Sequence, residues 1–262
     1  MTDSEIIRAI ESNLFELYRK VATFSRRPLY TGPFVSWVNC APSRWPSTIF
    51  GANFDAEDAG ERIRFVKDHI RDGSAPNFWS TGPSTRPANL DTLLMSEGFE
   101  KMWTTAGMGM ELSELKSDFE MPRGLEVEIV SDDRALRDWA RVVALGLFGC
   151  AESEVDNFYV LMKTITDCDR LELYLARQDG KPAGSATSYL SSDGIAGIYH
   201  VATLPEFRRR GIGRSVTLAP LLTSRALGAQ AAILQATAAG ESVYRQLGFR
   251  TICTLGRYRL VD

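Results

Sequence analysis

Two Asp-Gly pairs separate three apolar, β-rich runs, and this pattern constrains the fold more than any other feature of the chain. The pairs are Asp179-Gly180 and Asp193-Gly194, and the runs lie at 171–177, 183–190 and 195–203. Asp-Gly between such runs is a strong short-range hairpin signal, because both central residues of a tight hairpin turn adopt positive φ. The sequence therefore predicts a three-stranded antiparallel meander.

Helical and strand patterns continue on both sides of the meander. They predict a strand at 125–130, helices at 132–147, 152–166 and 211–227, a strand at 231–237, a helix at 241–247 and a last strand or hairpin at 249–260. Gly228 stands where a helix C-terminus is capped. Pro220 does not fit this scheme, because it removes a backbone donor and should bend or break its helix.

A loop rich in arginine and glycine, RRRGIG at 208–213, joins the meander to the next helix. The first turn of a helix carries unbonded N–H groups and a partial positive charge. Glycine lets a ligand approach this backbone, and arginine adds charge-assisted hydrogen bonds. Together they suit a pyrophosphate. The alternatives are a solvated basic loop, which leaves the glycines unexplained, and a contact with RNA or DNA.

The composition is that of an ordinary globular protein. The chain has 262 residues, 44% of them hydrophobic, and a formal net charge of −3, so a nucleic-acid backbone would need a local basic site. Four scattered cysteines and two histidines argue against a zinc site or a disulfide framework. No apolar stretch reaches the ~20 residues of a membrane span.

The first residues predict an amphipathic helix rather than a signal peptide. Thr2 and Glu5 have the spacing of a capping box, and apolar residues recur at helical spacing over 6–21. Glu5, Arg8 and Glu11 interrupt the apolar pattern. With free thiols that suit a reducing compartment, these features lead us to expect a soluble, cytoplasmic protein.

The end of the first half repeats the end of the second. LLMSEGF at 93–99 matches VYRQLGF at 243–249 in length and in its closing Gly-Phe, at an offset of 150, and strand-like runs flank both. We interpret this as an internal repeat joined by the charged stretch 113–124. The predicted units are residues 1–115 and 116–262.

The first copy lacks the basic loop. At the offset of 150, residues 208–213 correspond to 58–63, which read DAGERI. Acidic residues at 55, 57, 58 and 61 lie where the second copy has arginines and glycines. An anion bound by the second copy would be repelled by the first.

The loop and the closing motif together resemble a known family. RRRGIG matches the R/Q-x-x-G-x-G/A signature of the GNAT superfamily of N-acetyltransferases, and ESVYRQLGF resembles its motif B, in which a tyrosine shortly precedes Gly-Phe. The resemblance covers about residues 123–262, and the first half resembles a degenerate copy. It implies an α/β (α+β) fold with two GNAT-like domains, each a mixed, mostly antiparallel twisted sheet flanked by helices.

The resemblance assigns two stretches and two side chains to coenzyme A. The signature positions and the amides that would cradle the pyrophosphate are Arg208, Arg209, Arg210, Gly211, Ile212, Gly213 and Arg214. The bulged strand end that would pair with the pantetheine arm and polarise the thioester carbonyl is Val201, Ala202 and Thr203. Thr237 replaces the motif B asparagine. Tyr244 takes the place of the general acid for the departing thiolate, with a core tyrosine as the alternative, and its counterpart in the first copy is Leu94.

The glutamate base that several family members carry is missing, because its place on the strand is Gly197. A bare glycine could leave room for a water or a bulky acceptor, or it could mark a bulge or a close backbone approach. Strand alternation puts Tyr199 on the face of Gly197, and Ile198 and His200 on the other. A bulge would break that parity, so His200 stays a weak candidate for the base, with a satisfied core or surface histidine as the alternative.

These features predict an acetyl-CoA-dependent N-acetyltransferase that acts on the primary amine of a small or amino-acid-like acceptor, without a metal. A non-catalytic acyl-CoA-binding or sensor protein, and an acyltransferase with another acyl-CoA, stay open. Glu152, Glu154 and Asp156 could attract a cationic acceptor or could only complement a helix dipole. No nucleic acid or membrane is expected as a partner, and the chain would be a monomer built as a pseudo-dimer, or a homodimer.

Overall fold

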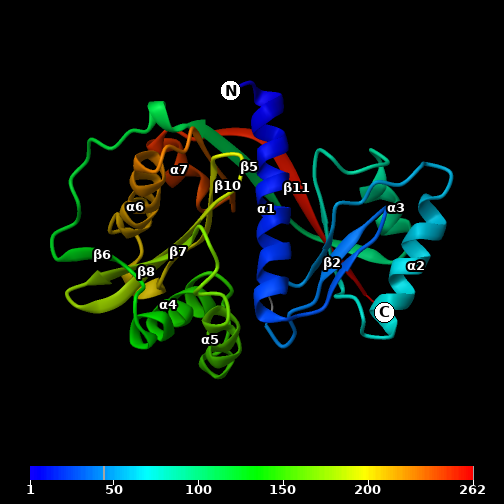
Figure 1. The fold of residues 1–262 in the computed structure, drawn as a ribbon, viewed down its shortest axis with the longest axis horizontal. Helices are drawn as coiled ribbons and strands as arrows, with labels where there is room; N and C mark the ends of the chain where they lie inside the picture. Colours follow the sequence, from blue (N-terminus) through cyan, green and yellow to red (C-terminus); the bar gives the residue numbers. More distant parts are fainter. Residues whose placement is uncertain (44, 262) are drawn as a thin grey trace.

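The computed structural model describes residues 1–43 and 45–261. These residues form helices on both faces of one 11-stranded sheet (Figure 1). The first half contains α1 (Asp3–Ser25), β1 (Leu29–Thr31), β2 (Ser36–Val38), β3 (Thr48–Phe50), α2 (Ala59–Arg71), β4 (Phe78–Thr81), α3 (Leu90–Ser96), β5 (Phe99–Glu111) and η1 (Leu112–Glu114). The second half contains β6 (Leu125–Ile129), α4 (Asp133–Gly146), η2 (Glu152–Glu154), α5 (Val155–Lys163), β7 (Leu171–Gln178), β8 (Lys181–Leu190), β9 (Ile195–Thr203), η3 (Pro205–Phe207), α6 (Ile212–Ala226), β10 (Ala231–Ala236), α7 (Glu241–Leu247) and β11 (Arg250–Leu260).

The predicted meander is confirmed. β7, β8 and β9 pair antiparallel in sequence order, and β6 adds an antiparallel edge strand beside β7. Asp179 and Gly180 have φ values of 50° and 75°, as a two-residue hairpin turn requires. The second connection, between Leu190 and Ile195, is longer, and in its Asp193-Gly194 pair only Gly194 has a positive φ, of 77°. β10 then pairs parallel with β9, so the sheet is mixed and mostly antiparallel, as expected.

The two halves share this sheet by exchanging strands. Its central order is β10-β5-β11-β4, so β5 of the first half lies between two strands of the second, and β11 lies between two strands of the first. All three of these pairings are antiparallel, and Leu255 lies opposite Thr105, 150 positions earlier in the chain. The arrangement is therefore the same seen from either half, in agreement with the internal repeat. The division at residue 115 stays a prediction.

Helix α1 belongs to the first half but covers strands of both. The predicted capping box is present, with the Thr2 side chain accepting from Glu5 N and the Glu5 carboxylate bonding back to Thr2. Its apolar stripe packs into the same core as α4 and α5 of the second half. Asn13 reaches from this helix to β9 and donates to the Ile195 carbonyl at 2.9 Å. Figure 1 shows α1 running between the two halves.

Helices α6 and α7 pack in a separate core on strands β9, β10 and β5. Gly228 follows α6 with a φ of 88°, as expected for a C-terminal cap. The expected break at Pro220 is wrong, because α6 continues through it from Ile212 to Ala226. Pro220 lies on the buried face of α6. The packing of this face on the sheet keeps the helix continuous although one backbone hydrogen bond is missing.

Candidate functional site

Strands β9 and β10 part beside the arginine-rich loop. Their parallel pairing runs from Ile195 opposite Ala231 to Ile198 opposite Leu234 and ends there. On its other side β9 stays paired with β8 as far as Thr203. The end of β9, which includes the predicted residues Val201, Ala202 and Thr203, therefore keeps one neighbour strand and turns its other edge to the split.

The predicted bulge lies at this end of β9. The register between β8 and β9 shifts between Ser185 and Thr187, and His200 adopts a φ of 49°. Beyond the bulge simple alternation is wrong: Tyr199 and His200 both pack on the side of α4 and α5, whereas Val201 packs towards α6. A bulge that re-aims the backbone in this way is common beside active sites.

The loop before α6 presents a run of free backbone donors. Gly211 caps the helix with a φ of 79°, and Arg209 adopts 63°. Among the residues that the structure describes, the six N–H groups from Arg209 to Arg214 have no hydrogen-bond acceptor; the next N–H, of Ser215, donates to the Gly211 carbonyl. Six donors at the positive end of a 15-residue helix have the chemistry that suits a phosphate anion. The loop therefore fits the pyrophosphate of coenzyme A.

Two arginine side chains of the loop have different surroundings. Arg208 turns back into the protein, where its Nε donates to the Thr203 carbonyl and its Nη2 to the Gly146 carbonyl, each at 3.2 Å. It therefore holds the loop against β9 and α4. Arg214 lies 4.0 Å from the centre of the Phe119 ring, and its buried Nε has no partner in the described part of the chain. The Arg214 Nε–H group is therefore free to donate a hydrogen bond beside the loop.

Tyr244 lies on α7 and packs beside the turn that follows β10. Its ring approaches Gly240 and contacts the core that joins α6, α7 and β5. Burial raises the pKa of the Tyr244 hydroxyl above its ordinary value, so the group keeps its proton at neutral pH. Thr237 lies in the same turn, where its carbonyl accepts from Gly240 and Glu241. This environment is compatible with a proton donor and with a packing residue.

The expectation of open space beside Gly197 is wrong. A Cβ at this position would overlap the Asn13 amide oxygen and the ring of Tyr199. The Tyr199 hydroxyl donates to that same Asn13 oxygen at 2.6 Å. Helix α1 therefore fills the place where a glutamate base would stand, and neither a water nor an acceptor fits there.

His200 is enclosed by aromatic side chains. It is 6% exposed, and its ring lies 4.2 Å from that of Trp45 and 5.5 Å from that of Trp139. Nδ1 lies 3.1 Å from the Thr187 hydroxyl, and Nε2 has no partner in residues 1–43 and 45–261. Burial lowers the pKa of His200 to about 3, so the ring is neutral and a weak base.

Acidic residues of η2 and of the first turn of α5 pair with arginines of α4. Glu152 bonds Arg141 at 2.7 Å, and Asp156 bonds Arg137 at 2.7 Å. Two of the three acids that could have attracted a cationic acceptor therefore already have a cation. Such exposed pairs join α4 to α5 and contribute little to stability.

The sequence of this region matches a known domain. Residues 169–251, from the start of the meander to the end of the closing motif, match the family model described as "Acetyltransferase (GNAT) domain". This part of the chain is a GNAT domain. The matched residues include both the loop at 208–213 and Tyr244.

Solved GNAT structures have the same fold as the whole chain. A GCN5-related N-acetyltransferase from Kribbella flavida is 17% identical, with a TM-score of 0.69 over 94% of this chain and 95% of that one. A GCN5-related N-acetyltransferase from Sphaerobacter thermophilus is 16% identical, with a TM-score of 0.64 over 88% and 81%. A tandem GNAT protein from the clavulanic acid biosynthesis pathway is 11% identical, with a TM-score of 0.59 over 86% and 77%. No curated protein sequence matches the chain.

The first half has the helix but not the loop of a GNAT phosphate site. Helix α2 begins after Asp58, which stands where α6 has Gly211. Measured from the Gly-Phe pair, Tyr244 corresponds to Leu94, and measured from the helix starts it corresponds to Leu93. Either way the first half offers an acidic helix start and a leucine.

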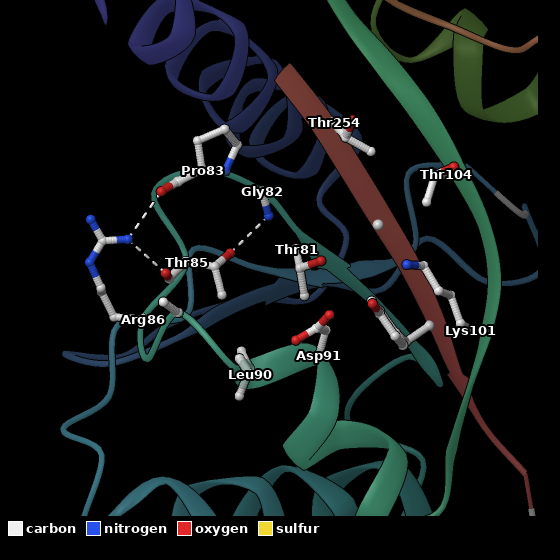
Figure 2. A pocket seen from close by; sticks show the side chains of 13 residues that line it. Thr81, Gly82, Pro83, Thr85, Arg86, Leu90, Asp91, Lys101, Thr104 and Thr254 are labelled. Atoms are coloured by element: carbon white, nitrogen blue, oxygen red, sulfur yellow. Dashed lines mark hydrogen bonds between the residues drawn. The ribbon is translucent and has the colours of Figure 1, made fainter. Parts of the chain in front are cut away.

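The stretch 113–124, predicted as a linker, packs on the arginine-rich loop: Phe119 contacts Arg214, and Pro122 lies against Gly211. A separate hollow of about 320 Å³ is lined by residues of the first half and of β11, and in it Asp91 of α3 and Lys101 of β5 project towards Thr81 (Figure 2). None of the predicted site residues lines it.

The described residues contain no candidate metal site and no candidate membrane span. No group of three or more His, Cys, Asp or Glu in these residues can hold a metal ion. Within the same residues, no helix combines the length and the apolar character that crossing a bilayer requires.

Proposed function

We propose that this protein transfers an acetyl group from acetyl-CoA to the primary amine of a small or amino-acid-like acceptor. The observation that carries the proposal is the run of six free N–H groups at the start of α6, beside the split between β9 and β10. A pyrophosphate held by the amides of Arg209 to Arg214 would direct its attached arm towards the free edge of β9.

The chemical step needs few protein groups. The amine nitrogen bonds to the thioester carbon, the carbon–sulfur bond breaks, and backbone N–H groups of the bulged end of β9 stabilise the oxyanion between these events. Tyr244 gives its proton to the departing thiolate, and the proton that the bonded nitrogen releases as it becomes an amide restores the Tyr244 hydroxyl. The acceptor ammonium has an ordinary pKa of about 10.4, so it must lose a proton first. Gly197 offers no base, and His200 is enclosed, so water would take this proton.

A second candidate is an acyl-CoA-binding protein without turnover. The specific observation in its favour is the plug at Gly197, where Asn13 and Tyr199 occupy the place of the family's glutamate. A third candidate keeps the enzyme and changes the acyl group, since nothing in the loop reads the acyl chain.

Mass spectrometry separates these candidates. The protein is incubated with acetyl-CoA and pooled primary amines, and with acetyl-CoA alone. Acetylated amines that form only with the protein support the proposal. Coenzyme A binding without a product supports the binding protein, and products that appear only with a longer acyl-CoA support the third candidate.

A further inference from the structure

A cavity at the junction of the two halves contains groups that the proposed transfer does not use. It encloses about 100 Å³ between α1 and strands β4, β11, β5 and β10. The antiparallel pair Thr105–Leu255, where the exchanged strands cross, forms its floor. A water occupies roughly 30 Å³ of liquid, so the space suits a few waters or one small polar head group.

Glu11 of α1 is a buried acid on the wall of this cavity. It is 4% exposed, and it is the one Asp or Glu that is buried in the part of the chain that the structure describes. Its two oxygens accept from Ser84, from the backbone N at 2.8 Å and from the hydroxyl at 2.9 Å. No described Lys or Arg forms an ion pair with it; the nearest charge effect is that of Arg86 through space.

A buried carboxylate without a cation is costly. Removing such a group from water costs several kcal/mol unless a counter-ion and hydrogen bonds compensate. Burial raises the pKa of the Glu11 carboxyl, which reports the same cost. Each oxygen still has one acceptor site free, since a carboxylate can accept about four hydrogen bonds. The Glu11 carboxylate can therefore accept hydrogen bonds from a cation in the cavity.

Arg257 and Gln235 lie on the sheet side of the cavity, where they supply a positive charge and hydrogen-bond donors. Arg257 Nη1 donates to the hydroxyls of Thr48 and Ser80. A guanidinium has five N–H donors, so Nε and Nη2 keep three without an acceptor among the described residues. The buried Nε2 of Gln235 likewise has no partner there. These donors suit a carboxylate.

We propose that the junction cavity binds the zwitterionic head group of an amino acid, with the ammonium at Glu11 and the carboxylate at Arg257 and Gln235. The opposite charges line one cavity without pairing with each other, as a zwitterion requires. The hydroxyl of Thr105 adds a polar contact, and the side chain of the amino acid extends along α1. The site needs both halves and is independent of coenzyme A.

Calorimetric titration of the full-length protein tests this site. Glycine, alanine and serine are the zwitterionic probes, and ethylammonium and acetate each carry one half of the head group. We expect at least one zwitterion to bind one per chain, more tightly than either half. Glu11→Gln should weaken that binding about 30-fold or more, because it removes one partner of a buried charge pair.

Matched variants distinguish a ligand role from a structural one. Glu11→Gln keeps an oxygen for Ser84, and Ser84→Ala removes the hydroxyl but leaves the charge, so Ser84→Ala should keep binding. Glu16→Gln removes an acid from the same helix that bonds Tyr189 outside the cavity, and it should change nothing. Arg257→Gln should weaken the zwitterion and acetate and spare ethylammonium.

The inference is overturned if no zwitterion binds, or if binding is unchanged in both Glu11→Gln and Arg257→Gln. Coenzyme A is titrated in parallel with the same samples. Loss of amino-acid binding with normal coenzyme A binding shows that the variant is folded. Absence of coenzyme A binding in the wild type contradicts the proposed transfer and leaves the test of the cavity intact.

Discussion

At the residue scale, burial shifts the pKa of two groups near the split, the hydroxyl of Tyr244 and the imidazole of His200. They lie on opposite sides of the sheet, Tyr244 with α6 and His200 with α4 and α5. Burial keeps the first protonated and the second neutral. Tyr244 can therefore give a proton at neutral pH, whereas His200 serves packing.

Replacing Tyr244 with Phe should lower kcat by about 10²- to 10⁴-fold, the usual contribution of a general acid. The ring is retained, so the core of α6 and α7 stays filled. Affinity for acetyl-CoA should change little, because the amides at Arg209 to Arg214 are untouched. Steady-state kinetics and a parallel binding titration measure both quantities. Normal turnover would make Tyr244 a packing residue.

His200 should make the protein acid-sensitive. In the unfolded chain its pKa is about 6.5, and in the folded chain it falls to about 3. Between these values the unfolded state binds the extra proton, so this contribution is complete above pH 6.5 and is lost as the pH falls. The loss is about 1.4 kcal/mol per pH unit.

Chemical denaturation at pH 7 and pH 5 measures this effect against His200→Gln, which cannot be protonated. The wild type should lose about 2 kcal/mol more than the variant between these two values. Equal losses in the two proteins would show that His200 is protonated in the folded state at pH 5.

At the element scale, the parts of the fold that could be predicted are those with local signals. The Asp-Gly turns identified the meander, the glycines and arginines located the start of α6, and the repeat of Gly-Phe showed the second copy. The bulge in β9 was expected only from the family resemblance, and the plug at Gly197 had no signal at all. Asn13 contacts Ile195, which lies 182 positions later in the sequence, and the local pattern of residues does not predict a contact at that separation.

The exchange of strands between the two halves also could not be predicted from the sequence, for a related reason. β5 and β11 each read as an ordinary strand at the end of its own copy, and pattern alone does not say which neighbours a strand pairs with. The consequence is physical: Met108 and Met110 of β5 belong to the core that holds Tyr244 and Leu247. The second half thus lacks part of its own core.

Residues 120–262 expressed alone should therefore be poorly soluble. Without β5 this fragment leaves the edge of β10 unpaired and exposes the apolar surface that Met108 and Met110 cover. Coexpression with residues 1–119 should restore a soluble complex. The soluble fraction and gel filtration of each preparation measure this. A monomeric and active 120–262 fragment would show that the first half is an independent passenger.

At the scale of the whole molecule, the two halves share one sheet, and we expect them to form a pseudo-dimer with one phosphate site. Both halves contribute to the sheet and to the junction cavity, but the N-cap of α6 is Gly211, whereas the N-cap of α2 is Asp58. Fusion makes the contact between two copies intramolecular, at a high effective concentration. The first copy can then keep its structural contribution after losing an anion site of its own.

Calorimetric titration with coenzyme A counts the sites on the chain. We expect one coenzyme A per chain, and Gly211→Glu should weaken its binding about 100-fold or more, because the glutamate sets a like charge against the pyrophosphate. Gly228→Glu is the matched control: it has the same left-handed backbone, with a φ of 88° against 79°, and lies at the far end of α6. It should bind normally. Two coenzyme A per chain, or unchanged affinity in Gly211→Glu, would contradict the account.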